Sequence, residues 1–137
     1  MEIINKNLIK HQSYIDGEWL EMLDGSSTSI YNPANQEKIG DVSSCGTKEI
    51  NKAIEAACIA QKKWAKVPSK EKSEALNRLY LLMLENQEDL AKIITYEQGK
   101  PLLESRGEIL YGAAYIQWFA EEAKRIYGDI IPGHMSD

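Results

Sequence analysis

The sequence has few cysteines and histidines, and they are scattered. Its 137 residues include two cysteines, Cys45 and Cys58, and two histidines. Because none of the four stands at metal-ligand spacing or beside a partner for nucleophilic chemistry, the pattern disfavours a zinc site and a cysteine nucleophile. Residues 1–10 are polar and lack the apolar core of a secretory leader. We therefore expect both cysteines to be free thiols in a cytoplasmic protein.

Long apolar runs and basic blocks are also missing. The most apolar window, residues 109–120, falls short of the ~20 apolar residues that a bilayer span needs. The 16 basic and 21 acidic residues give a formal charge of −5, and no run of Lys or Arg could neutralise a phosphate backbone. The sequence therefore predicts neither a membrane nor a nucleic-acid partner. A hydrophobic content of 43% is still enough for a buried core.

Strand and turn signals occupy the first forty residues. Asp16-Gly17 between apolar runs predicts a hairpin over residues 13–23, because glycine accepts the positive φ of a type I′ turn. Residues 29–33 and 39–42 favour two more short strands, the first ending at Asn32-Pro33. The sequence thus predicts a short N-terminal β-hairpin followed by further strands.

From Thr47 onward the apolar spacing becomes helical. It predicts one helix from Thr47 to Pro68, a second capped by Ser69, a third from Asn86 to Gly99, and a last one from Pro101 to Tyr127. The fold class is α+β, with strands followed by four amphipathic helices. Because β-α-β alternation is missing, the sequence does not encode a free-standing doubly wound sheet.

Several clusters allow a structural or a functional interpretation. Tyr111, Tyr115, Trp118 and Phe119 recur at helical spacing, which suits a core stripe or the lining of a ligand channel; spacing alone favours the core. Gly107 and Gly112 match the outer glycines of a phosphate loop. The Lys and Ser/Thr that should follow are alanines, so we expect close helix packing there instead. Further along, Glu121 and Arg125 predict an ion pair on a solvated face.

Three motifs together resemble the N-terminal part of the aldehyde dehydrogenase superfamily. They are YIDGEW at 14–19 with YNPA at 31–34, EQGKPL at 97–102, and WFAEEAKRIYGD at 118–129. The first two are similar to sequences found across the superfamily, and the third looks most like its succinate-semialdehyde dehydrogenase branch. Their order and spacing match over nearly the whole chain.

The resemblance implies an oxidoreductase of which this chain is a portion. Superfamily members are several times longer, and their Rossmann-like cofactor strands, nucleophilic cysteine and general-base glutamate would lie beyond Asp137. Residues 1–137 are then the N-terminal portion of a cofactor-binding domain and hold no catalytic or cofactor-binding residue. The complete enzyme, a homo-oligomer, would oxidise succinate semialdehyde or a similar small aldehyde with NADP or NAD. The isolated chain would bind neither cofactor tightly and would be inactive.

Two local roles carry over with the resemblance. The last helix borders the substrate channel in relatives, which places Tyr111, Tyr115 and Trp118 on the channel wall. Glu97 resembles an acidic residue that holds Na⁺ or K⁺ together with backbone carbonyls, although a solvated glutamate at a helix end is the simpler account. A different class of function also stays open: a non-catalytic helical module that binds a protein partner.

Overall fold

The first hairpin forms as the sequence predicts. The structure is a computed structural model that describes residues 2–21 and 26–134. Strands β1 (Ser13–Ile15) and β2 (Glu18–Leu20) pair antiparallel. Asp16 and Gly17 between them have φ values of 53° and 86°, both positive as a type I′ turn requires. Residues 22 and 23 of the predicted hairpin lie outside the described residues.

The other two predicted strands form a second hairpin. Strands β3 (Ser27–Tyr31) and β4 (Lys38–Ser43) pair antiparallel, with a register irregularity between Ile30 and Tyr31. A short 3₁₀ helix, η1 (Lys6–Leu8), precedes both hairpins. The N–H of Ser43 donates to the carbonyl of His11 at 2.8 Å. This bond attaches the N-terminal segment to the end of β4.

The four predicted helices are confirmed. They are α1 (Thr47–Trp64), α2 (Ser69–Glu85), α3 (Gln87–Gln98) and α4 (Leu102–Glu122). The residue expected to terminate α3, Gly99, adopts the left-handed conformation with φ 72°. The caps of the first two helices differ from those predicted: Gly46 caps α1 and Pro68 caps α2, so that Thr47 and Ser69 already lie inside their helices.

The predicted C-terminal end of α4 at Tyr127 is wrong. The helix ends at Glu122 because the chain tightens there into i→i+3 bonds: Lys124 donates to Glu121 and Arg125 to Glu122. The predicted ion pair changes for the same reason. Arg125 forms its ion pair with Glu122 and not with Glu121. In a backbone turn closed by i→i+3 hydrogen bonds, the side chain three positions earlier lies within reach of the arginine.

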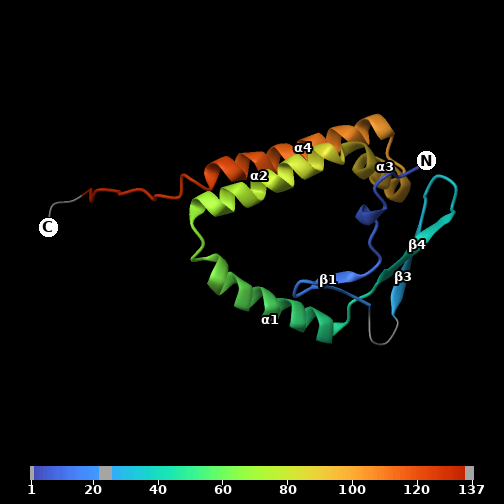
Figure 1. Ribbon diagram of the computed structural model, residues 1–137, viewed down its shortest axis with the longest axis horizontal. Coiled ribbons are helices and arrows are strands. Elements are labelled where there is room, and N and C mark those ends of the chain that lie inside the picture. Colours follow the sequence, from blue (N-terminus) through green and yellow to red (C-terminus); the bar gives the residue numbers. More distant parts are fainter. Residues whose placement is uncertain (1, 22–25, 135–137) are drawn as a thin grey trace.

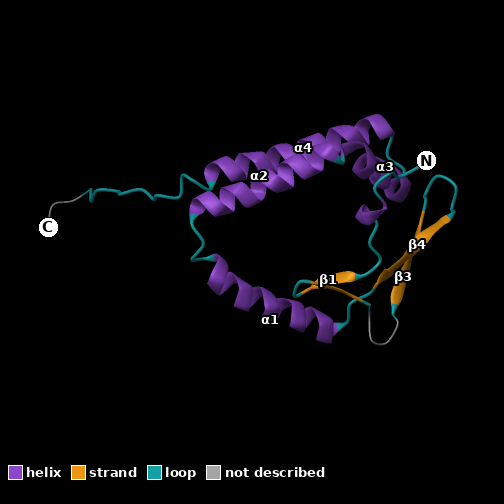
Figure 2. Ribbon diagram, in the orientation of Figure 1, coloured by secondary structure: helices purple, strands orange, loops and turns teal. Residues whose placement is uncertain are grey.

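The helices form two separate groups. Figure 1 shows α2 and α4 side by side and running in opposite directions, with α3 packed near the start of α4, whereas α1 lies apart from this pair next to β1 (Figures 1 and 2). The buried hydrophobic residues are few and mostly small: Ile15, Ala91, Ile109, Ala113, Ala120 and Ala123. Helix α1 has no buried residue, so its predicted inner face of Ile50, Ile54 and Trp64 stays exposed.

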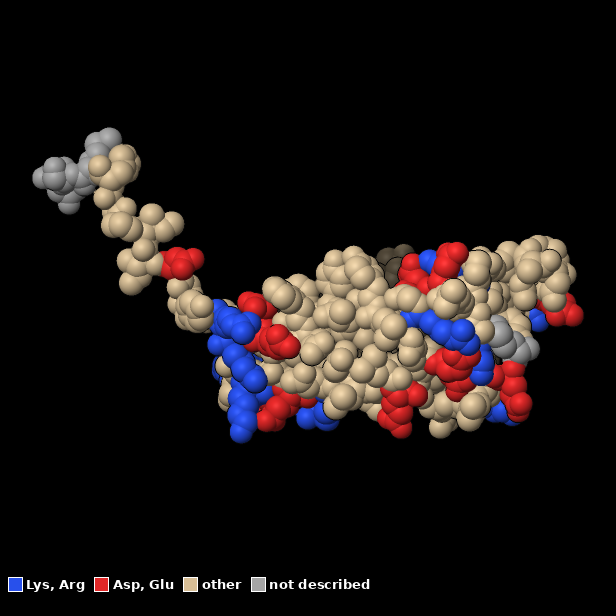
Figure 3. Space-filling view, turned by 90° about the horizontal axis from the view of Figure 1, so that it is seen from above, with Lys and Arg blue, Asp and Glu red and all other residues tan. Residues whose placement is uncertain are grey.

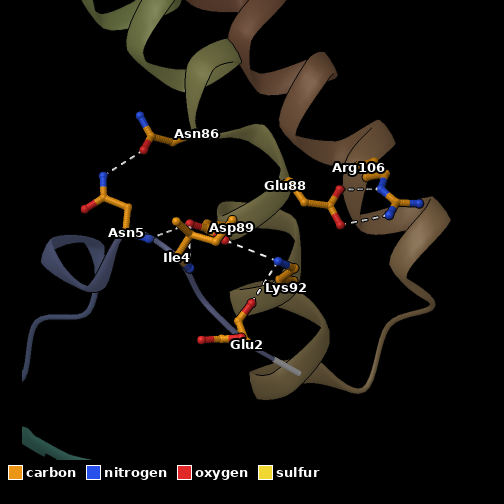
Figure 4. A network of polar contacts seen from close by, with 8 residues as sticks. All are labelled: Glu2, Ile4, Asn5, Asn86, Glu88, Asp89, Lys92 and Arg106. Atoms are coloured by element: carbon orange, nitrogen blue, oxygen red, sulfur yellow. Dashed lines mark hydrogen bonds and ion pairs between the residues drawn. The ribbon is translucent and has the colours of Figure 1, made fainter.

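Asp89, in the first turn of α3, anchors the N-terminal segment (Figure 4). Its carboxylate accepts hydrogen bonds from the backbone N–H groups of Ile4 at 3.0 Å and Asn5 at 2.7 Å, and Lys92 Nζ lies 3.4 Å from its second oxygen. The side chains of Asn5 and Asn86 bond beside it at 2.8 Å. The pKa of Asp89 lies below its ordinary value because hydrogen bonds stabilise the charged carboxylate. The largest contribution comes from the N–H of Asn5, followed by the N–H of Ile4 and by Lys92.

The substitution Asp89→Asn is expected to destabilise the chain in a pH-dependent way. The folded-state pKa lies below the unfolded one near 3.8, so the stabilisation is complete above that value and is lost as pH falls through the folded pKa. The difference in melting temperature between the parent and Asp89→Asn should therefore be largest near neutral pH and shrink below about pH 4. Calorimetry over this range measures it, with Asp129→Asn in the exposed C-terminal segment as control. Equal losses at neutral and acid pH would contradict the anchoring role.

No helix among the described residues is long and apolar enough to cross a membrane. The cytoplasmic location stays a prediction.

Candidate functional site

Helix α4 presents most of its large apolar and aromatic side chains to solvent. The side that packs on α2 and α3 buries small residues, with Ser105 and Ala120 at 0% exposure and Ala113 at 1%. The opposite side carries Leu103, Leu110, Tyr111, Tyr115, Trp118 and Phe119, each at least 48% exposed. Figure 3, which looks onto the helices from above, shows a broad uncharged surface with charged side chains mainly at its edges. A core role for the aromatic stripe, favoured by its spacing, is therefore wrong within this chain.

The aromatic residues on this face form one site. Tyr111, Ala114, Tyr115, Trp118 and Phe119 line a shallow cavity of about 320 Å³. We call these five residues the α4 aromatic site. Its three proposed channel residues, Tyr111, Tyr115 and Trp118, come together because positions i, i+4 and i+7 of a helix share a face.

Tyr111 and Tyr115 are in direct contact within the α4 aromatic site. Their rings meet edge-on, with centroids 5.0 Å apart and planes at 76°, and their hydroxyl oxygens are 2.9 Å apart. The hydrogen bond to Tyr115, then desolvation and the nearby negative charge of Glu108, raise the pKa of Tyr111. The site thus has an apolar surface with one pair of neutral, hydrogen-bonding groups. The i, i+4 spacing of two tyrosines was the signal in the sequence that could have predicted this pair.

Glu97 lies in a different part of the molecule. It is exposed in the last turn of α3 and lines a larger cavity of about 720 Å³ between the N-terminal segment, β3, β4 and α3. The described residues contain no group of three His, Cys, Asp or Glu side chains that could hold a metal ion. A monovalent cation at Glu97 stays a prediction. The cavity itself had no local sequence signal, because its walls come from segments far apart along the chain.

The two glycines of α4 and the two cysteines form no phosphate loop and no disulfide among the described residues. Gly107 and Gly112 lie inside α4 and not in a loop before a helix N-terminus, so they do not fit the phosphates of NADP or NAD. At Gly112 an added Cβ would lie 3.6 Å from Met83 of α2, as close helix packing predicts, whereas Gly107 faces open space. Both cysteines are free; Cys58 is exposed, and Cys45 donates from its Sγ to the hydroxyl of Ser13 at 3.2 Å.

Comparison with known proteins places this architecture in a family. The model of the aldehyde dehydrogenase family matches residues 19–137, and the chain belongs to that family. It matches the N-terminal part of the fold, as the strands and four helices predict.

The relatives most similar to the chain include semialdehyde dehydrogenases. It is 52% identical to a glutarate-semialdehyde dehydrogenase of Pseudomonas putida and 47% identical to a succinate-semialdehyde dehydrogenase (NADP(+)) of Escherichia coli, in each case over 100% of this chain and 28% of the relative. A crystal structure of succinate-semialdehyde dehydrogenase from Burkholderia pseudomallei superposes with a TM-score of 0.93 at 41% identity, covering 98% of this chain and 28% of that one. The chain thus spans little more than a quarter of the length of these relatives.

Proposed function

We propose that residues 1–137 are the N-terminal portion of the cofactor-binding domain of an NAD(P)-dependent semialdehyde dehydrogenase. The complete enzyme, a homo-oligomer, oxidises succinate semialdehyde or a similar aldehyde to its acid. NADP⁺ or NAD⁺ accepts the hydride when bound, and water supplies the acid oxygen. The relatives named for glutarate and succinate semialdehyde support this substrate class, since their identities of 52% and 47% extend over the whole chain.

The observation that carries the role of this chain is the outward apolar face of α4. A contiguous group of exposed large apolar side chains usually marks a surface that another part of a protein covers. If the rest of the enzyme covers it, the α4 aromatic site becomes one wall of an enclosed pocket, the environment that small-molecule sites use. We propose that Tyr111, Tyr115 and Trp118 line the substrate channel in this way. The chain supplies scaffold and channel wall, and the remaining sequence supplies the nucleophile, the base and the cofactor site.

A chimeric enzyme tests this function. Residues 1–137 would be joined to the remaining part of the Pseudomonas putida relative in place of its own N-terminal segment, and reduction of NADP⁺ and NAD⁺ would be followed by absorbance. We expect semialdehyde-dependent reduction by the chimera at a rate comparable to that of the parent, and none by the 137-residue chain alone. The parent enzyme without its N-terminal segment is the matched control and should be inactive.

Two outcomes would contradict the proposal. One is a chimera that folds and assembles like the parent but does not oxidise semialdehydes. The other is turnover by the chain alone that disappears on Cys45→Ala or Cys58→Ala, because a thiol of this chain would then be the nucleophile. The first outcome would favour the alternative, a non-catalytic helical module that binds a protein partner.

A further inference from the structure

The hydroxyl pair of Tyr111 and Tyr115 has an unused donor. A phenol hydroxyl has one proton to donate and can also accept. The bond between the two oxygens, 2.9 Å apart, uses one of the two protons and leaves the other. Among the described residues neither hydroxyl has a further hydrogen-bond partner. The pair therefore places one free O–H donor in a wall whose other members, Ala114, Trp118 and Phe119, are apolar or mostly so.

The charges around the pair permit an anionic ligand. Glu108, the nearest acidic residue on the same helix, acts on Tyr111 through its negative charge. That carboxylate is compensated, because Lys100 Nζ lies 2.5 Å from its Oε1. Because Lys100 pairs with Glu108, part of the negative charge beside the hydroxyl pair is compensated, which lowers the repulsion that an anion would meet there.

Resting on the proposed function, we propose that the Tyr111–Tyr115 pair determines substrate specificity by donating its free O–H to the carboxylate at the far end of a semialdehyde, while Trp118 contacts the methylene chain. An O–H···O⁻ bond to a carboxylate is among the stronger hydrogen bonds in proteins. One well-placed polar group in an apolar wall fixes the orientation of a ligand. The pair would thus distinguish a semialdehyde from an aldehyde of equal length without the carboxylate.

The test compares two aldehydes in the chimeric enzyme. Succinate semialdehyde and butanal have the same four-carbon chain, and only the first carries a carboxylate. In the double variant Tyr111→Phe/Tyr115→Phe we expect the KM for succinate semialdehyde to rise by about 10- to 100-fold, the effect of losing a hydrogen bond to a charged group, with little change in kcat. The KM for butanal should stay within about twofold, since that substrate has no group for the hydroxyl to bind.

Matched variants make the result specific. Tyr14→Phe/Tyr31→Phe removes two hydroxyls from exposed tyrosines of the strands, 62% and 51% exposed, and should leave both KM values unchanged. The single variants Tyr111→Phe and Tyr115→Phe replace the double variant if it does not fold, and the tyrosine that contacts the carboxylate should show the larger effect. Equal changes for the two aldehydes, or no change for either, would overturn the proposal while leaving the dehydrogenase function intact. A parent chimera that oxidises neither aldehyde would overturn both.

Discussion

The substitution Gly99→Ala is expected to lower the free energy of unfolding by about 1 to 2 kcal/mol, and by more if the neighbouring loop cannot move. Gly99 has φ 72°, and a residue with a Cβ is strained by roughly that amount in the left-handed region. A Cβ here would also lie 3.0 Å from Cγ of Pro33, in the loop between β3 and β4. Because the proline ring is rigid, the turn between α3 and α4 or the strand loop must shift. Thermal unfolding should show a decrease of roughly 3 to 5 °C for each kcal/mol lost.

Gly107→Ala is the matched control. Gly107 lies inside α4, and an added Cβ would meet nothing within 4 Å. An alanine in a helix interior is more stable than a glycine by roughly 0.5 to 1 kcal/mol, so this variant should melt at the same temperature as the parent or higher. If Gly99→Ala melted as high as Gly107→Ala, the left-handed helix end and its contact with Pro33 would both be wrong.

The features that could be predicted are those that depend on residues close together in the sequence. The Asp16-Gly17 turn and the Gly99 helix end depend on the φ that glycine allows, which is a local property. The end of α4 was predicted five residues too late, at Tyr127 and not at Glu122, because no glycine or proline marks the point where the bonds tighten. The Asn5–Asp89 bond joins residues 84 positions apart and gives no signal in a local pattern.

The sequence predicts which residues form the candidate site, but it does not predict that their side chains are exposed. Helical periodicity places Tyr111, Tyr115 and Trp118 on one face regardless of what covers that face. Whether an apolar face is core or surface depends on the neighbouring elements. Helix α4 packs against α2 and α3, and most of its buried residues are small, such as Ala113 and Ala120, whereas its large rings lie on the exposed side. The hydroxyl bond between the two tyrosines depends on side-chain rotamers, which periodicity does not fix.

The isolated chain is expected to self-associate through α4. Trp118 is 62% exposed, Phe119 56% and Tyr111 65%, and an aromatic side chain can bury roughly 150 to 250 Å². Together with Leu103 and Leu110 they form an apolar surface that reaches or exceeds the roughly 300 to 600 Å² of the largest patch on a typical monomer. Sedimentation velocity over a range of concentrations should therefore show species larger than the 15.5 kDa monomer, and a dye that binds apolar surfaces should fluoresce with the dilute chain.

Two charged double variants locate the contact. Trp118→Lys/Phe119→Lys puts two positive charges in the apolar face and should shift the chain toward monomer, because burying an unpaired charge opposes association. The control is Ile130→Lys/Ile131→Lys, which changes two isoleucines that are 98% and 88% exposed in the C-terminal segment and should leave association unchanged. If only the control variant became monomeric, the C-terminal segment and not α4 would be the contact. A compact monomer at every concentration without dye binding would instead favour the free-standing module, because the apolar face would then need no cover.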